Sequence, residues 1–196
     1  MLATQMKLVE RLMRALKEHD EATYRHSRRV KSLAHDLALA LGLPEVDAAE
    51  VALAAGVHDV GKLKVDAMVL QKTFKLHSGD WGSLIAHPVD GAEMLEDIPL
   101  LADLAPAVLH HHERWDGRGY PHCLRGEQIP LASRIIAIVD VFDAISSHRP
   151  YRTPMTSREA LDYVAREAGG AFDPRIVWVF LHNFSERHQT RLAANA

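Results

Sequence analysis

The chain has 196 residues, of which 47% are hydrophobic and 25% charged, a composition typical of one soluble globular domain with its own core. Its formal net charge of -3 argues against binding to long nucleic acid, although a local arginine cluster is enough for a small anion. A single cysteine, Cys123, excludes an internal disulfide, and the chain shows neither a signal peptide nor a transmembrane run. We therefore expect a cytoplasmic protein that does not bind membranes.

Apolar residues recur at helical spacing through most of the chain. The first such stretch, 2–18, is expected either to pack in the core or to connect to a partner domain, and the core is the simpler interpretation. Further helices are predicted over 23–41, from Pro44 to His58, from a cap at Ser78 to His87-Pro88, over 89–96, over 101–112, over 131–145, from a capping box at Thr156 to Ala168, and from Pro174 onward. Pro88 is expected to end one helix or to open the next. The stretches 62–77 and 116–130 are predicted to be irregular.

No stretch shows the alternation expected of strands, so the predicted fold class is all-α with no significant sheet. Residues 1–18 would form an N-terminal helix, 19–184 the functional domain, and 185–196 a loose polar tail. The helix over 131–145 is almost continuously apolar, which predicts that it is the buried central helix. A homodimer through the N-terminal helix is compatible with this arrangement.

Histidine is abundant in this chain, with 13 residues, which directs attention to metal binding. His58-Asp59 ends an alanine-rich predicted helix, and a carboxylate beside an imidazole can bind one divalent ion or bridge two through its two oxygens. Such a pair taken alone is usually surface decoration. Further candidate ligands lie where predicted helices leave the core: His26, His87, His111, His112 and Asp140.

Two of the carboxylates lie inside the most apolar predicted helix. Asp140 and Asp143 would be costly to bury there unless each were paired or bound to a metal. His26 has a plainer alternative as a satisfied core residue. A bridging carboxylate, several imidazoles and open positions for water and substrate are what two-metal hydrolysis of a phosphoester requires.

The order of these residues resembles the HD-GYP family of bacterial cyclic di-GMP phosphodiesterases. The resemblance extends from about Leu8 to Leu181 and is specific as a combination, although no single motif is. It implies a helical bundle core of the HD superfamily built around a metal site. The matching pattern is His26, His58-Asp59-x-Gly61-Lys62, His87-Pro88, His111-His112-Glu113, Asp116-Gly117-x-Gly119-Tyr120-Pro121, Asp140-x-x-Asp143 and Arg149-Pro150-Tyr151-Arg152.

The resemblance implies two divalent ions that share one carboxylate. Family members with a third ion carry a glutamate where this chain has Ala22, so two ions are expected. Iron or manganese is favoured, and ligands of this kind also accept other transition metals. Asp143 would orient a histidine from behind. The first ion would be bound by His26, His58, Asp59 and Asp140, and the second by Asp59, His87, His111 and His112.

The same resemblance implies roles in catalysis and in substrate binding. Asp59 and Lys62 would be catalytic, with Lys62 facing the scissile phosphate; a structural salt bridge is the alternative for Lys62. Arg149 and Arg152 match positions that bind the phosphates, which suits a guanidinium fork, and their alternative is a solvated surface. Tyr120 lies in the signature loop, which is expected to shape the substrate rim or to contact a partner domain.

The implied function is hydrolysis of cyclic di-GMP to pGpG, GMP or both, by a metal-activated hydroxide. One alternative is a phosphodiesterase for another cyclic dinucleotide, such as 3′,3′-cyclic GMP-AMP. Another is a module that senses cyclic di-GMP, or docks a diguanylate cyclase (GGDEF) domain, with weak or no catalysis. The complete ligand set favours the enzyme. An upstream regulatory domain is a further expected partner.

Overall fold

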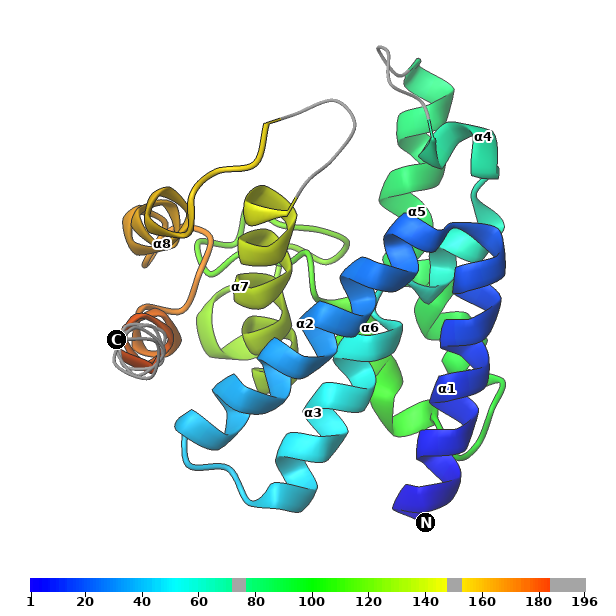
Figure 1. The fold of residues 1–196 in the computed structure, drawn as a ribbon, viewed down its shortest axis with the longest axis horizontal. Helices are drawn as coiled ribbons and strands as arrows, with labels where there is room; N and C mark the ends of the chain where they lie inside the picture. The colour runs from blue at the N-terminus through cyan, green and yellow to red at the C-terminus, as the bar shows by residue number, and fades with distance from the viewer. Residues whose placement is uncertain (72–76, 148–152, 184–196) are drawn as a thin grey trace, which may run out of the picture.

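A computed structural model describes residues 1–71, 77–147 and 153–183 (Figure 1). Its helices lie where apolar residues recur at helical spacing in the sequence. Within those ranges the β-type pairing is one isolated bridge, between Ala168 and Phe172, so the all-α expectation is confirmed. The elements are α1 (Leu2–His19), α2 (Glu21–Ala40), α3 (Glu45–Val57), the 3-10 helix η1 (Val60–Lys64), α4 (Ala67–Leu70), α5 (Ser78–Glu96), η2 (Ala102–Leu104), α6 (Ala105–Leu109), η3 (Gly126–Gln128), α7 (Leu131–Ser146), α8 (Ser157–Arg166) and a last helix over 174–183.

Helix α7 is the buried central helix that its apolar sequence predicts. It contacts α2, α3, α6 and α8, and Ile135, Ile136, Ile138 and Val139 on it are completely buried. Figure 1 shows α2 and α3 running side by side next to it. None of the described helices is both long and apolar enough to cross a membrane. Because α7 itself is buried, its carboxylates lie in a protein core, where each needs a charged partner or an ion.

Helix α1 packs against α2, α3 and η1 through one apolar face. Val9, Met13 and Leu16 on that face are buried. This burial agrees with the core interpretation of the first helix. The division into 1–18, 19–184 and 185–196 stays a prediction, and the tail of the last range lies outside the described residues.

Three local expectations need correction. The stretch 62–77 is not wholly irregular, because its described part contains the end of η1 and the short helix α4. The predicted helix over 101–112 is instead η2 followed by α6, which ends at Leu109. Pro106 at the start of α6 has no N–H to continue the η2 turn, which divides the stretch. Helix α5 begins at Ser78 with His77 as its N-cap and continues through Pro88 without a break.

Candidate metal centre

All seven predicted metal ligands lie together at the junction of η1 and α6 with α2, α5 and α7. Two sets have ligand atoms that lie within 4.8 Å of one another, and we call them the His26 group (His26, His58 and Asp140) and the His87 group (His87, His111 and His112). A third set, His58, Asp59 and His111, meets the same criterion and connects the two groups. Residues far apart in the sequence thus form two adjacent sites of the composition that divalent transition metals prefer.

Asp59 lies between the two groups and offers one oxygen to each. Its Oδ2 is 3.5 Å from Nε2 of His58, and its Oδ1 is 3.3 Å from Nε2 of His87. The side chain is only 2% exposed, so both oxygens are held away from bulk water. A carboxylate in this position is suited to bridge two ions.

The histidines at helix ends are oriented by backbone carbonyls. Nδ1 of His58 lies 2.7 Å from the carbonyl oxygen of Ala55, and Nδ1 of His111 lies 2.6 Å from that of Val108. Both carbonyls belong to the last turn of their helix, where the helix supplies no donor. A carbonyl only accepts, so each Nδ1 carries the hydrogen and each Nε2 presents a lone pair to the site.

His87 reaches the same arrangement inside a helix. Its Nδ1 lies 2.5 Å from the carbonyl oxygen of Leu84. In an unbroken helix that oxygen would accept from the residue four positions later, but this residue is Pro88, which has no N–H. The proline of the His-Pro pair therefore frees the acceptor that orients the histidine.

His26 is oriented by a carboxylate. Its Nδ1 donates to Oδ2 of Asp143 at 2.7 Å, while its Nε2 lies 2.8 Å from Oδ1 of Asp140. Asp143 thus orients a histidine, as the sequence predicts. Burial lowers the pKa of His26, but the hydrogen bonds with Asp140 and Asp143 outweigh it and raise the pKa to about 9. An ion in the His26 group would take the place of the proton on Nε2.

The signature loop lies against the His87 group. Tyr120 stacks on the ring of His112, with centroids 5.0 Å apart and an interplanar angle of 27°. Glu113, which is 3% exposed, accepts hydrogen bonds from the backbone N–H groups of His122 and Leu124. Gly119 lies against the backbone of Glu113 and Arg114, in space that a Cβ would fill. The loop is therefore anchored directly behind a predicted ligand.

Close backbone packing brings η1 against α5. A Cβ on Gly61 would overlap the carbonyl oxygen of His87 and would lie 2.6 Å from the backbone nitrogen of Gly91. Glycine is thus required at this position of the motif, because it lets the two segments approach closely. The approach places Asp59 next to His87.

The charges of the centre favour metal binding. Burial lowers the pKa of His111 well below its usual range and lowers that of His112 to about 4. Burial acts in the opposite direction on Asp59, but the charge of Lys62 holds the pKa of Asp59 well below its ordinary value. Neutral imidazoles and ionised carboxylates are the forms that bind metals.

Two further observations test whether divalent ions fit. Nε2 of His58 is buried and has no hydrogen-bond partner among the described residues. Nε2 of His87 and Nε2 of His111 lie 3.3 Å apart, and both rings use Nδ1 as the donor to a carbonyl. Two lone pairs at that distance repel unless a cation lies between them. The residues therefore fit the two ions that the sequence predicts.

The other predicted functional residues are placed as follows. Nζ of Lys62 lies 2.7 Å from Oδ2 of Asp59, which is the salt bridge that the sequence leaves as its alternative. Arg149 and Arg152 lie outside the described residues. His110, which directly precedes the His111-His112 pair, has its Nε2 3.1 Å from Nδ1 of His122 and is not one of the predicted ligands.

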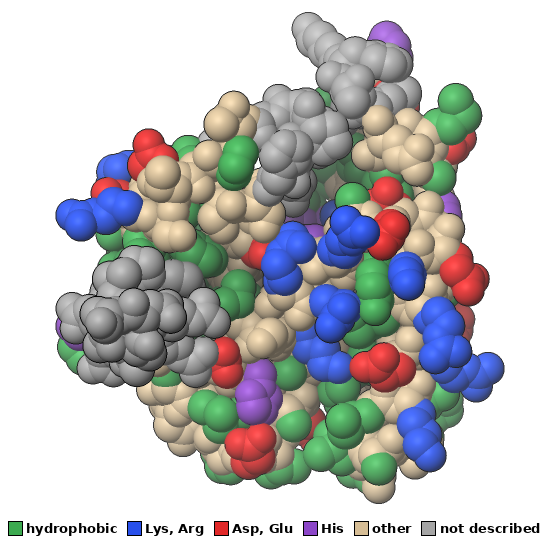
Figure 2. Space-filling view, viewed as in Figure 1, with side chains coloured by type: hydrophobic (Ala, Val, Ile, Leu, Met, Phe, Trp, Pro, Cys, Tyr) green, Lys and Arg blue, Asp and Glu red, His purple; other side chains and the backbone are tan. Residues whose placement is uncertain are grey.

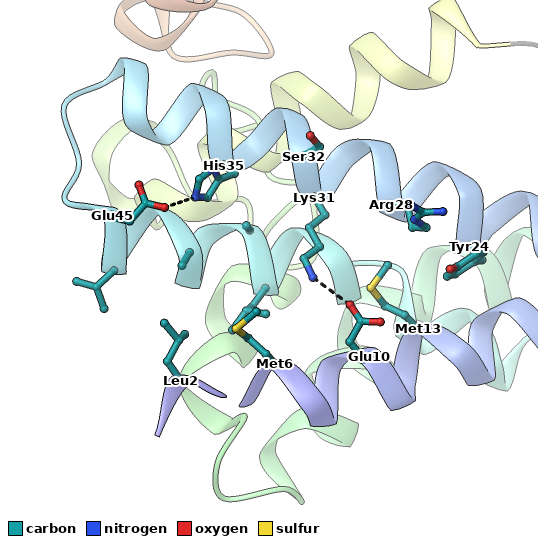
Figure 3. Close-up of a pocket in the computed structure, with 14 residues that line it drawn as sticks. Leu2, Met6, Glu10, Met13, Tyr24, Arg28, Lys31, Ser32, His35 and Glu45 are labelled. Atoms are coloured by element: carbon teal, nitrogen blue, oxygen red, sulfur yellow. Dashed lines mark hydrogen bonds and ion pairs between the residues drawn. The ribbon is translucent and has the colours of Figure 1, made fainter. Parts of the chain in front are cut away.

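A cavity of about 830 Å³ lies elsewhere, between α1, α2 and α3 (Figure 3). Its walls combine apolar side chains such as Met6 and Val46 with the ion pair of Lys31 and Glu10 and the hydrogen-bonded pair of His35 and Glu45. The residues that line it include none of the seven predicted ligands. The metal centre is thus distinct from this cavity.

The helical fold and the paired ligand groups define a class of protein, a helical domain with buried His/Asp clusters whose composition suits metal ions. A family model described as HD domain matches residues 10–176, so the chain belongs to the HD domain family. Its relatives also confirm the resemblance to HD-GYP phosphodiesterases. The chain is 44% identical over 167 residues to a cyclic di-GMP phosphodiesterase of Pseudomonas aeruginosa, covering 85% of this chain and 40% of that protein.

Two other relatives have related names. One is the cyclic di-GMP phosphodiesterase response regulator RpfG of Xanthomonas campestris, 38% identical, covering 92% of this chain and 48% of the relative. The other is 3′3′-cGAMP-specific phosphodiesterase 2 of Vibrio cholerae, 34% identical, covering 93% of this chain and 35% of the relative. The chain therefore spans at most about half the length of these three relatives.

Solved structures share the fold. A cyclic GMP-AMP-specific phosphodiesterase of V. cholerae matches with a TM-score of 0.69 at 21% identity, covering 91% of this chain and 48% of that one. The HD domain of the Listeria monocytogenes phosphodiesterase PgpH matches with a TM-score of 0.65 at 17% identity, covering 92% and 98%. At these identities the likeness establishes the helical architecture.

Sequence reasoning assigned no role to Arg29 or Glu113. Arg29 donates two hydrogen bonds to Asp143, and Glu113 anchors the signature loop. A signal was present for both residues. Arg29 lies three positions after His26, on the same side of a predicted helix, and Glu113 directly follows the histidine pair.

Proposed function

We propose that this chain is a metal-dependent phosphodiesterase that hydrolyses cyclic di-GMP. The observation that carries the proposal is the position of Asp59, with one oxygen toward each of the two ligand groups. The relatives named cyclic di-GMP phosphodiesterases support the choice of substrate. The ligands are His26, His58, Asp59 and Asp140 for one ion and Asp59, His87, His111 and His112 for the other.

The reaction adds one water across a phosphodiester bond. The bond between phosphorus and the 3′ oxygen breaks. The hydroxyl group of the water joins the phosphorus, the 3′ oxygen takes the proton, and the product is linear pGpG. A second hydrolysis would yield GMP. When bound, the ions supply Lewis acidity and neutralise phosphate charge. Asp59 holds both halves of the centre together. Lys62 is 23% exposed at its side chain and can exchange its contact with Asp59 for a phosphate oxygen of the substrate.

Other parts of the chain would bind the substrate. Tyr120 is held flat against His112, at the rim of the centre, and contributes ring surface for a base or sugar. Burial raises the pKa of Tyr120 above its usual value, so the phenol stays neutral and does not repel phosphate. Arg149 and Arg152 are proposed to bind the phosphates. Lysine and arginine side chains also gather over α1 and α2 on the face in Figure 2, which favours an anionic ligand despite the net charge of -3.

A second candidate substrate is 3′,3′-cyclic GMP-AMP, because several V. cholerae relatives are named as specific for it. The two substrates share the same phosphodiester ring, so the metal centre serves either one. A sensing or docking module with weak or no catalysis is the remaining alternative. The two complete ligand groups favour the enzyme.

Finer aspects of the function are part of the same proposal. Iron or manganese is the favoured metal, because imidazole and carboxylate ligands suit both. A diguanylate cyclase domain or an upstream regulatory domain is a proposed partner, and a homodimer through α1 is a proposed assembly. The cytoplasm is the proposed location.

The test uses protein purified without oxygen and reconstituted with Fe²⁺ or Mn²⁺. Metal per chain is measured, and cyclic di-GMP and 3′,3′-cyclic GMP-AMP are each incubated with the protein and separated by chromatography. We expect two ions per chain and conversion of cyclic di-GMP to pGpG or GMP. Faster turnover of the mixed dinucleotide would move the assignment to that substrate. Two ions with tight nucleotide binding and no product would replace the enzyme by the sensing module.

A second test uses Lys62→Met, which keeps most of the side-chain length and removes the charge. If Lys62 contacts the phosphate, the variant keeps two ions and loses turnover. If Lys62 is only the salt-bridge partner of Asp59, the variant changes metal affinity and turnover together.

A further inference from the structure

Arg29 connects to the His26 group through two charged contacts. Its Nε donates to Oδ1 of Asp143 at 2.6 Å and its Nη2 donates to Oδ2 at 2.9 Å. Oδ2 of Asp143 also accepts from Nδ1 of His26 at 2.7 Å. A bidentate guanidinium–carboxylate pair has a defined orientation, because both hydrogen bonds must be satisfied in one plane. Arg29 therefore determines where Asp143 presents its oxygen to His26.

This arrangement differs from that of the other oriented histidines. His58, His87 and His111 each use a carbonyl three residues earlier, at a helix end or before a proline. His26 lies in the interior of α2, where the helix itself occupies the backbone carbonyls. Its Nδ1 needs an acceptor from another element, and Asp143 on α7 provides it across 117 positions of sequence.

An acceptor on a separate helix must be held in place. The Asp143 side chain is 5% exposed, so its charge requires a partner, while the Arg29 side chain is 46% exposed. The arginine neutralises the buried carboxylate and joins α2 to α7 at the point where His26 and Asp140 also meet. The pair thus acts on the position of one ligand group, whereas the His87 group has no contact with it in the described residues.

We propose that Arg29 and Asp143 are positioning residues that preorganise the His26 group for its ion and leave the His87 group unaffected. The inference rests on the two-ion function proposed above. It adds a physical reason why the two ions would respond differently, in their binding affinity, to a change at Arg29. Partners that orient a ligating histidine in this way typically contribute about 10-fold to 100-fold to metal affinity.

The experiment titrates Mn²⁺ alone into metal-free protein and follows heat and bound metal. Arg29→Met removes the charge and both hydrogen bonds but keeps the aliphatic stem. We expect one of two ions to bind about 10-fold to 100-fold more weakly, and the other to keep its affinity. Arg29→Lys keeps the charge without the fork, so an intermediate loss is expected. Should Arg29→Met fail to fold, this second variant carries the test.

The matched control is Arg25→Met on the same helix. Arg25 pairs with Glu21 four residues earlier, both side chains are more than half exposed, and neither contacts the centre. This variant also loses an arginine–carboxylate pair from α2. It should bind two ions as the wild type does.

Combining Arg29→Met with His26→Ala identifies which of the two ions is affected. His26→Ala should bind one ion, and adding Arg29→Met to it should cause no further loss, because both changes act on the same group. Equal weakening of both ions, unchanged affinity of Arg29→Met, or a further loss in the His26→Ala background would overturn the inference. Fewer than two ions in the wild type would instead contradict the proposed function.

Discussion

Nδ1 of His87 lies 2.5 Å from the carbonyl oxygen of Leu84, and this acceptor is available because Pro88 interrupts the hydrogen bonding of α5. Proline normally weakens a helix, but Pro88 leaves free the carbonyl oxygen that orients His87. Local stability and metal binding are therefore expected to oppose each other at this position.

We predict that Pro88→Ala has opposite effects on the two properties. The new N–H can bond to the Leu84 carbonyl, so metal-free protein should be more stable, by up to about 3 kcal/mol. The same bond competes with His87, so one Mn²⁺ ion should bind more weakly. Urea unfolding of metal-free protein and Mn²⁺ titration measure the two effects. Unchanged affinity for both ions would show that Pro88 does not act through the Leu84 carbonyl.

Gly61→Ala should destabilise the protein. Its Cβ would overlap the carbonyl oxygen of His87, and backbone on both sides cannot move away cheaply. Overpacking of this kind typically costs about 1–3 kcal/mol, and here it also separates Asp59 from His87. Urea unfolding of metal-free protein gives the free energy.

The control for this change is Gly82→Ala. Gly82 is an exposed glycine inside α5, and a Cβ there would meet no atom within 4 Å. Alanine in a helix should raise the free energy of unfolding by about 0.5–1 kcal/mol. If both variants were equally stable, the close approach of η1 to α5 would be contradicted.

Glu113→Gln should loosen the signature loop while both ions stay bound. An amide group presents a donor where Glu113 now accepts from two backbone N–H groups, so one partly buried donor loses its partner at a cost of about 1–3 kcal/mol. Hydrogen exchange over 117–125 should accelerate, with Mn²⁺ stoichiometry unchanged. Glu159→Gln on the exposed cap of α8 is the control and should leave that loop as it is.

Asp59→Asn should weaken the binding of both ions. The amide keeps one oxygen and cannot serve two ions, so each affinity should fall at least about tenfold, which corresponds to about 1.4 kcal/mol per ion. His26→Ala should weaken one ion instead. Metal analysis after gel filtration distinguishes the two patterns. A loss of only one ion from Asp59→Asn would exclude the bridging position.

Most of the fold was readable from the sequence, because helical periodicity and caps are local. The buried helix α7 and the Thr156–Glu159 capping box occur where they were predicted. Besides the short helical segments within 62–77, the errors fall at Pro88 and Pro106, where a proline affects its helix in opposite ways. One lies inside a continuing helix and the other divides a predicted one, and the packing around each decides between them.

The identities of the candidate ligands follow from the chain alone, because residue type and spacing specify which side chains are chemically able to bind metal. The roles of Arg149 and Arg152 stay predictions that rest on the resemblance to the HD-GYP family. The grouping around Asp59 and the partner of each Nδ1 depend on segments distant in sequence. His26 meets Asp143 across 117 positions, and Arg29 gains its role only through that contact. Such contacts arise from packing between helices, which local patterns do not encode.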